Sequence, residues 1–266
     1  MGILIRNEGR VRVVMIDRRD VRNAVDPETA LALFTAFQEF DRDASADIAI
    51  LTGTGSVFCA GFDLKAAADG NGAEWIRSLD IPPNWDPVAH PIPGPMGPTR
   101  LMLSKPVIAA IEGHAVAGGL ELAIWCDMRV AAEDASLGVY CRRWGVPLID
   151  GGTVRLPALI GQGRANDLIL TGRAVGANEA MDMGLINRLT PSGEALSGAM
   201  ELAESLLKFP QMCMRADHLS ARPAPLQLGA ALKREWASVA VLAAEGVAGA
   251  ARFASGMGRG GRFDEI

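Results

Sequence analysis

Residues that can act on a carbonyl group are concentrated in the stretch from Ile108 to Met128. It reads as a buried strand, a turn of small residues, and a helix that begins at Gly118-Gly119 and carries Glu121 in its first turn. The first amides of a helix lack intrahelical acceptors, and a helix N-terminus favours negative charge. Because such amides can donate to an oxyanion, we predict a site for carbonyl chemistry here.

The same stretch resembles the signature of the enoyl-CoA hydratase/isomerase (crotonase) superfamily. Gly113 is followed by three variable residues, then by three Ala or Gly residues (117–119), and the run closes in Cys126-Asp127-Met128. A match of this length is specific, whereas a lone glycine-rich turn would mean little. The resemblance implies an α/β fold, a crotonase-like spiral of repeated ββα units over residues 1–195. It also implies a C-terminal helical region, residues 196–266, that forms a homotrimer or a dimer of trimers.

A second segment, residues 58–64, resembles the other oxyanion-hole element of the superfamily. The residue after Ala60-Gly61 is Phe62, so the resemblance implies that Phe62 and Gly118 hold the thioester oxygen of an acyl-CoA. The alternative for Gly61 and Gly118 is an ordinary tight-turn glycine. The resemblance further implies substrate contacts by Arg22, Ala24, Ala60, Gly61, Asp63, Leu64, Gly119, Cys141 and Arg142.

The acid and base residues depart from the family pattern. Hydratases of the family use two glutamates to hold and deprotonate water, and Glu121 matches the first. The second position falls on Cys141, whose neutral thiol cannot replace a carboxylate. Cys141 is otherwise a small packing residue. Glu121 itself has a second explanation, because the helix dipole alone favours a carboxylate in a first turn.

Asp150 is a second candidate carboxylate. It precedes Gly151-Gly152-Thr153, where several superfamily isomerases carry a working Asp. Asp150 either faces the site beside Glu121 or caps the helix that opens near Thr153. If it faces the site, burial and mutual repulsion should raise at least one carboxyl pKa toward neutrality.

Several nearby charged residues have competing interpretations. Arg142 and Arg143 are solvated, ion-paired (with Glu121 as one candidate), or in reach of a polar acyl group. Arg22 either binds CoA phosphates, as basic residues do in relatives, or forms an exposed salt bridge. Asp127 is expected to be structural and to accept amides at a helix end.

Three functions are open at this point. The first is an enoyl-CoA hydratase, a lyase in which Glu121, helped by Asp150, handles water and proton. The second is an enoyl-CoA or dienoyl-CoA isomerase, in which one carboxylate moves a proton between carbons. The third is an acyl-CoA-binding homologue without efficient catalysis. Retention of Glu121 favours the hydratase.

Bulk properties fit a soluble enzyme. The 266 residues carry a net charge of −5 without a basic stripe, which argues against nucleic-acid binding. The four cysteines lack CxxC spacing, and the three histidines lack metal-ligand spacing. No unbroken apolar run approaches a membrane span, and we see no secretion signal. We therefore expect a cytoplasmic protein with reduced thiols, no metal and no cofactor, since coenzyme A is part of the substrate.

Hydrophobic patterning predicts alternating strands and helices. The predicted strands cover residues 11–16, 48–52, 107–111, 128–132 and 137–141, and an amphipathic helix starts at Asp26 and runs to about residue 41. Residues 66–98, rich in Pro and Gly, predict a long loop with at most short helices, which we expect to shape the acyl pocket. Residues 225–255 predict a long Ala-rich helix.

Overall fold

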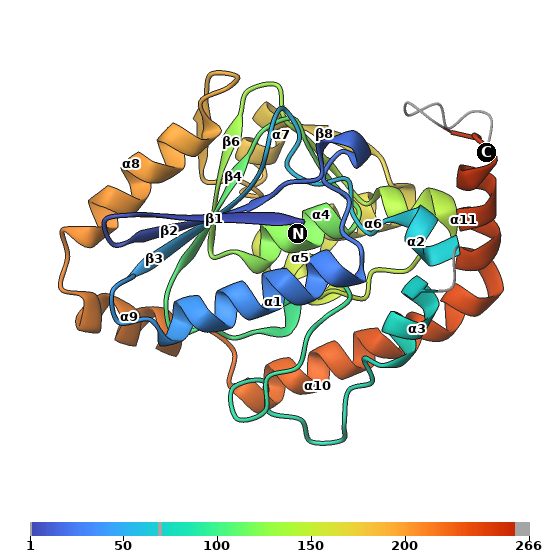
Figure 1. Ribbon diagram of the computed structural model, residues 1–266, viewed down its shortest axis with the longest axis horizontal. Coiled ribbons are helices and arrows are strands. Elements are labelled where there is room, and N and C mark those ends of the chain that lie inside the picture. The colour runs from blue at the N-terminus through green and yellow to red at the C-terminus, as the bar shows by residue number, and fades with distance from the viewer. Residues whose placement is uncertain (1, 69–70, 259–266) are drawn as a thin grey trace.

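A six-stranded sheet forms the centre of the computed structural model, which describes residues 2–68 and 71–258. All neighbouring strands are parallel except the first pair, which is antiparallel. In spatial order the strands are β1 (Ile3–Glu8), β2 (Val11–Ile16), β3 (Ile48–Gly53), β4 (Val107–Ile111), β6 (Met128–Ala132) and β9 (Arg188–Thr190) (Figure 1).

A second, three-stranded sheet lies beside the first and consists of β5 (His114–Val116), β7 (Ser136–Gly138) and β8 (Ala174–Gly176). The chain runs from β4 to β5 to the helix α4 (Gly118–Trp125), and then from β6 to β7 and back into helices. Each turn thus adds one strand to each sheet before a helix follows. This arrangement is the repeated ββα spiral that the resemblance implied.

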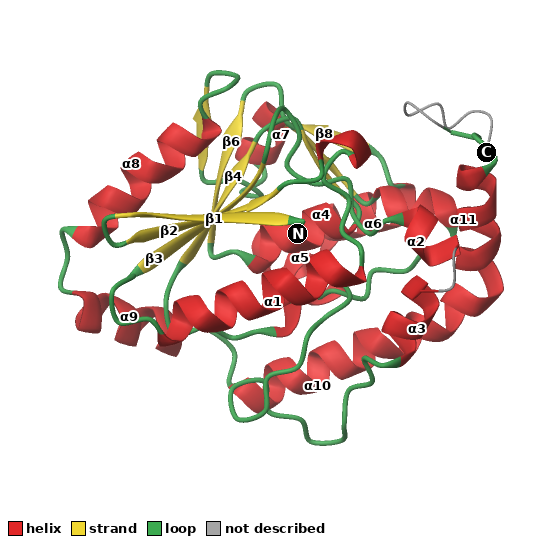
Figure 2. Ribbon diagram, in the orientation of Figure 1, coloured by secondary structure: helices red, strands yellow, loops and turns green. Residues whose placement is uncertain are grey.

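Helices cover both faces of the large sheet (Figure 2). Helix α1 (Pro27–Arg42) begins where Asp26 accepts a hydrogen bond from the Thr29 amide, and with α4 it packs on one face. Helix α8 (Ala195–Leu207) packs on the opposite face through its alanines. The central strands are therefore buried on both sides, as their nearly continuous apolar sequences require.

Most predicted elements are confirmed, but the strand expected at 137–141 is wrong in its second half. Strand β7 ends at Gly138, and a 3-10 helix, η3, covers Tyr140–Trp144. The antiparallel partner of β7, β8, pairs only with residues 136–138, so the residues after Gly138 have no β8 neighbour to extend the ladder. The high strand propensity of Val139 and Tyr140 cannot compensate for absent partners. Strands β1, β5 and β8 and helix α9 (Gln211–Ser220) were not predicted from the sequence.

The long loop predicted at 66–98 is confirmed. Its described residues contain the end of α2 (Leu64–Ala68) and α3 (Asn71–Arg77), and the 3-10 helix η2 (Pro98–Arg100) begins at its last residue. Three further helices lie between β7 and α8: α5 (Gly152–Ile160), α6 (Gln162–Thr171) and α7 (Ala177–Asp182).

The C-terminal part of the described chain is helical from α8 onward. The predicted long helix is confirmed as one stretch over Pro225–Ala254, made of α10 (Pro225–Trp236), η4 (Ala237–Val239), a π-helical turn, η5 (Leu242–Gly246), and α11 (Val247–Ala254). The division of the chain at residues 195 and 196 stays a prediction, and its last residues, 259–266, lie outside the described part.

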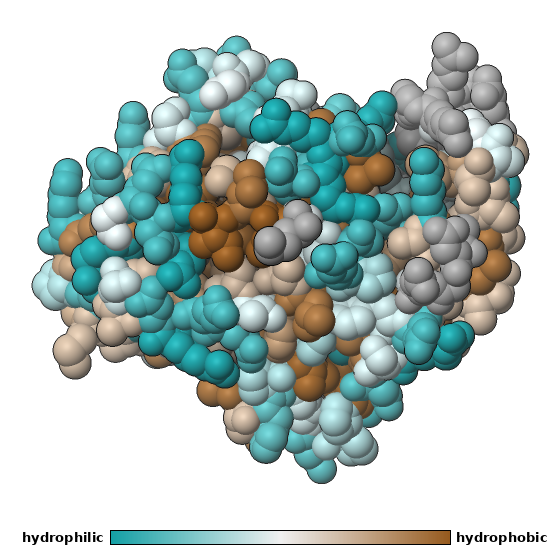
Figure 3. Space-filling view, in the orientation of Figure 1, coloured by the Kyte–Doolittle hydropathy of each residue, from teal (hydrophilic) through white to brown (hydrophobic). Residues whose placement is uncertain are grey.

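The stretch Pro225–Ala254 is the one described helix that is long and apolar enough to cross a membrane. Length and composition are its only membrane-like features, and 17% of its most apolar window is buried. Figure 3 shows pale and brown apolar atoms along the edge of the molecule where α11 lies. The first part of the stretch, α10, carries Glu235, which is 6% exposed and binds the Gly151 and Thr153 amides, so α10 packs against the start of α5.

Candidate active site

The two chain segments that are predicted to form an oxyanion hole lie against each other. The Cys59 amide donates to the His114 carbonyl at 3.0 Å, and the Val116 amide donates to the Cys59 carbonyl at 3.1 Å. Gly61 has φ +101°, and a Cβ there would lie 3.0 Å from the Gly118 nitrogen. Glycine is therefore required at residue 61 by the close approach of the two segments as well as by its backbone angle.

The amides of Phe62 and Gly118 are free to donate. Gly118 is the first residue of α4, and within residues 2–68 and 71–258 neither amide has a hydrogen-bond acceptor. The Met96 side chain lies against Gly118, since a Cβ on this glycine would be 2.6 Å from the Met96 sulfur. Two unpaired amides on adjacent segments are the arrangement that an oxyanion hole needs.

Glu121 is buried in the first turn of α4, and its side chain binds backbone amides at the start of α5. Its Oε1 accepts hydrogen bonds from the amides of Asp150 at 2.8 Å and Gly152 at 2.9 Å. Burial raises the pKa of Glu121 well above its usual range, and the nearby charges of Asp150 and Glu235 add to this. The helix dipole therefore does not by itself explain this glutamate.

Asp150 does not cap α5, so its helix-capping interpretation is wrong. Its Oδ1 accepts a hydrogen bond from the Met96 amide at 2.9 Å and another from the Thr99 hydroxyl. The N-cap residue of α5 is Gly151, which has no side chain. The amides of Gly152 and Thr153 at the start of α5 donate to Glu121 and Glu235 instead. Burial raises the pKa of Asp150 to about 6. The raised pKa values expected for paired carboxylates are thus present in both residues.

Glu235 is a third buried carboxylate of the cluster, and the sequence analysis missed it. It comes from α10 and accepts hydrogen bonds from the Gly151 amide at 2.5 Å and from the Thr153 amide at 2.8 Å. Burial raises its pKa as well. No local pattern marks Glu235, because the turn that it binds lies more than eighty residues earlier. The sequence feature that could have indicated it is Gly151-Gly152, because two adjacent glycines leave backbone amides open to a carboxylate.

Cys141 lies in η3 and is 6% exposed. Burial raises the pKa of its thiol to about 12, and the Glu121 charge adds to the shift. The thiol therefore stays protonated and cannot act as a base. Its correspondence to the second hydratase glutamate stays a prediction.

The arginines after Cys141 turn away from Glu121. The Arg142 Nε donates to the Ile169 carbonyl at 3.1 Å, and Arg143 donates to the Gly172 carbonyl at 2.9 Å. Among the described residues Arg142 forms no ion pair with Glu121, so that interpretation is wrong for Arg142, and for Arg143 it stays a prediction. A substrate contact by Arg142, whose side chain is exposed, stays a prediction.

The predicted substrate-binding residues between Arg22 and Leu64 lie on two segments that meet at Phe62. Arg22 is exposed and, within the described chain, has no ion pair, so its salt-bridge interpretation is wrong. Its carbonyl accepts the Ala60 amide at 3.1 Å, which joins the two loops. Asp63 accepts the Lys65 amide at 3.0 Å and pairs with Arg18 at 3.1 Å, a structural task at the start of α2. Ala24 is buried, whereas Ala60 and Leu64 are half-buried.

Asp127, which was expected to be structural, is confirmed as such. Its Oδ2 accepts the Val107 amide at 2.8 Å, and its Oδ1 lies 2.7 Å from the His218 Nε2. These bonds tie the end of α4 to the start of β4 and to α9. In the described part of the chain, no three His, Cys, Asp or Glu residues are placed to hold a metal ion.

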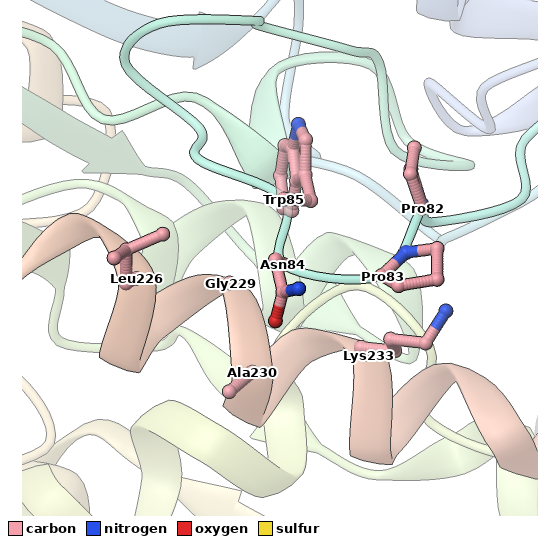
Figure 4. Close-up of a pocket in the computed structure, with 8 residues that line it drawn as sticks. All are labelled: Pro82, Pro83, Asn84, Trp85, Leu226, Gly229, Ala230 and Lys233. Atoms are coloured by element: carbon pink, nitrogen blue, oxygen red, sulfur yellow. The ribbon is translucent and has the colours of Figure 1, made fainter.

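The long loop approaches the carboxylates only at its C-terminal end. Gly94, Met96 and Thr99 contact Asp150, and the Trp75 Nε1 braces this segment by donating to the Pro95 carbonyl at 3.1 Å. Earlier in the loop, Trp85 packs instead against α10. There the loop and α10 border a separate surface pocket of about 430 Å³ (Figure 4), lined by Pro82, Pro83, Asn84, Trp85, Leu226, Gly229, Ala230 and Lys233. That pocket shares no residue with the carboxylate cluster.

Comparison with known proteins agrees with this geometry. The enoyl-CoA hydratase/isomerase family model matches residues 6–237. An enoyl-CoA hydratase of Mycobacterium tuberculosis is 37% identical over 210 residues, 76% of this chain and 73% of that protein. A carnitinyl-CoA dehydratase of Salmonella typhi is 37% identical over 215 residues, 80% of this chain and 77% of that protein.

Solved structures are similar over nearly the whole chain. A carnitinyl-CoA hydratase from Mycobacterium avium has a TM-score of 0.80 and 29% identity, covering 96% of this chain and 95% of its own. An enoyl-CoA hydratase from the same species has a TM-score of 0.75 and 32% identity, covering 92% and 98%. These relatives support an enzyme of hydratase type. With its two glycine segments and its buried Glu121, the chain belongs to the enoyl-CoA hydratase/isomerase family.

Proposed function

We propose that this protein adds water across the double bond of a 2-enoyl-CoA thioester. One observation carries the proposal: the buried Glu121 carboxylate binds the backbone amide of Asp150, itself a buried carboxylate, and Met96 links Asp150 to Gly118. The Met96 amide donates to Asp150 while its side chain lies against Gly118. Acid–base groups and oxyanion donors are therefore neighbours, as addition next to a thioester requires.

In this proposal the amides of Phe62 and Gly118 bind the thioester oxygen. When water attacks the β carbon, the π electrons move toward that oxygen and an enolate forms. Donors that are already in place stabilise this charge without rearrangement, and loss of one such donor in other enzymes costs roughly 3 to 4 kcal/mol. Arg22, exposed next to this segment, is proposed to contact the CoA phosphates.

The two carboxyl groups divide the proton transfers. Burial raises the pKa of Asp150 to about 6 and that of Glu121 well above its usual range, and in the proposed mechanism Asp150 starts ionised and Glu121 starts protonated. Ionised Asp150 takes a proton from water as the oxygen bonds to the β carbon. Protonated Glu121 then gives its proton to the α carbon as the enolate collapses to the thioester. Proton exchange with solvent restores the starting state.

The test uses purified protein with crotonyl-CoA and a 3-enoyl-CoA. Hydration removes the absorbance of the conjugated thioester and yields 3-hydroxyacyl-CoA. Asp150→Asn and Glu121→Gln should each lower turnover by about 10²-fold or more while changing CoA affinity little. The matched control is Glu112→Gln, because Glu112 also binds helix-start amides, those of Gly193 and Ala195, but lies outside the site.

Two outcomes would contradict the proposal. Conjugation of the 3-enoyl substrate without any 3-hydroxyacyl-CoA would identify a double-bond isomerase. Tight acyl-CoA binding without either spectral change would identify a binding protein.

A further inference from the structure

Four consecutive amides at the start of α5 are held by two carboxylates from distant helices. Glu121 of α4 binds the amides of residues 150 and 152, and Glu235 of α10 binds those of residues 151 and 153. The Thr153 hydroxyl also donates to Glu235, at 2.7 Å. The amides of a helix start, which normally bind solvent or a local cap, are here shared alternately between Glu121 and Glu235.

The glycines of this turn make the double approach possible. Gly151 has φ +91°, and a Cβ there would collide with the Arg155 guanidinium. A Cβ on Gly152 would lie 2.9 Å from the Glu121 Oε1. Any larger residue would therefore displace one of the groups that hold the turn. The path of residues 150–153 is set by tertiary contacts rather than by the local sequence.

We propose that Glu235 is a positioning residue that fixes the 150–153 turn and thereby holds Asp150 in place, with its amide on Glu121 and its carboxylate on Met96 and Thr99. The inference rests on the proposed function for its kinetic test. Glu235 acts through backbone amides and does not itself touch the reacting atoms. The hydrogen bonds of Glu235 thereby connect its helix, α10, to the 150–153 turn of the site.

Charges from every neighbouring element act on Asp150. Glu121 approaches from α4 and Glu235 from α10, while Arg155 of α5 donates to the Asp150 carbonyl at 3.1 Å. The fourth group, Arg100 of η2, is stacked on Trp236 with its guanidinium carbon 4.3 Å from the ring centroid. Burial is the main cause of the raised Asp150 pKa, Arg100 opposes the shift, and the Glu235 charge adds to it. Loss of the Glu235 charge should therefore lower the pKa of Asp150.

The decisive variant is Glu235→Gln. Both Glu235 oxygens accept hydrogen bonds, and a glutamine keeps one acceptor but turns an NH₂ toward the other amide donor. We expect kcat for crotonyl-CoA hydration to fall by about 10- to 100-fold, because a small displacement of a catalytic group is costly, with KM changed little. We also expect the limb of the pH–rate profile that belongs to the carboxyl pair to move to lower pH.

Matched controls separate this role from plain structural support. Glu245→Gln removes one exposed charge from the same helical stretch and should leave kcat and the pH profile at wild-type values. Glu235→Asp keeps the charge on a shorter side chain, so kcat should fall while the pH profile moves less than in Glu235→Gln. If Glu235→Gln lowers only the melting temperature and leaves kcat and the pH profile unchanged, the proposal is overturned.

A readout without substrate keeps the two proposals distinguishable. Amide hydrogen exchange at residues 150–153 should accelerate in Glu235→Gln and stay at the wild-type rate in Glu245→Gln. Failure of wild-type protein to hydrate crotonyl-CoA would refute the proposed function, and the exchange rates would still decide whether Glu235 holds the turn. Unchanged exchange at these four amides would refute the positioning role of Glu235 even in an active hydratase.

Discussion

The two amides proposed as oxyanion donors and the carboxylate cluster are neighbours that depend on opposite kinds of structure. The amides of Phe62 and Gly118 belong to the backbone, and glycines at 61 and 119 let the two segments approach each other. The carboxylates are side chains from three helices or turns, Glu121, Asp150 and Glu235, that are held by amides rather than by local sequence.

The backbone amides and the carboxylates should therefore be sensitive to different kinds of substitution. A backbone donor depends on the path of the chain, so it is sensitive to any added Cβ but indifferent to the side chain at residue 62. A buried carboxylate depends on its neighbours' charges, so its protonation changes whenever a charge nearby is removed. The four predictions below test this contrast, from the largest effect to the smallest.

Removal of the Glu121 carboxylate should have the largest effect. Glu121→Gln is expected to lower kcat by roughly 10²- to 10⁴-fold, the usual contribution of a positioned acid or base. Crotonyl-CoA hydration, followed through the loss of conjugated-thioester absorbance, measures it. Turnover within the range of the Glu112→Gln control would remove Glu121 from the chemistry.

Displacement of the backbone amides of Phe62 and Gly118 should have the second-largest effect on kcat. Gly61→Ala places a Cβ 2.9 Å from the Ala117 Cβ at a backbone angle that alanine rarely adopts, so the two amides should separate. We expect kcat to fall by about 10²- to 10³-fold, similar to the loss of an oxyanion donor. Gly163→Ala is the control, because nothing lies within 4 Å of a Cβ at that position. Equal kinetics of the two variants would argue against an oxyanion hole at this place.

The raised pKa of Asp150 predicts a pH-dependent stability. Its folded pKa of about 6 exceeds the ordinary value of 3.8, so its contribution to stability is full below the lower pKa and is lost as pH rises through the higher one. The unfolding free energy of wild type minus that of Asp150→Asn should therefore fall by up to about 3 kcal/mol between pH 4 and pH 7. Urea denaturation across this range measures the difference. A pH-independent difference would show that the pKa of Asp150 is ordinary.

The smallest effect is expected at Cys141. Its thiol, with a pKa raised to about 12 by burial, is protonated throughout the working range. Cys141→Ala should therefore keep kcat within roughly threefold of wild type, since a neutral thiol is neither base nor nucleophile. Steady-state kinetics with crotonyl-CoA give the comparison. A loss close to that of Glu121→Gln would assign the thiol a catalytic task.

The backbone half of the site was largely predictable. The strands at 11–16 and 107–111, the helix after Gly118 and the segment around Gly61 follow from local patterns, since hydrophobic period and glycine placement act over a few residues. The second half of the strand predicted at 137–141 was wrong, because strand propensity cannot show where the neighbouring strand stops. Helix α9 escaped prediction because it has no buried residues and thus no strong apolar stripe.

The carboxylate half was predictable only in part. The sequence offered Asp150 two roles, and only the packing of residues 94–99 against it excluded helix capping. Glu235 had no signal of its own, because its partners lie on a turn distant in sequence.

From the sequence by itself, the family and the spiral fold followed from the resemblance carried by residues 58–64 and 113–128, and the glycine-bordered amides followed from local patterns that act over a few residues. The tertiary structure decided which carboxylates share one turn, which of them are buried, and which arginines face them. Those properties arise from desolvation and charge over distances of a few ångströms between segments far apart in the chain, and no local pattern encodes them.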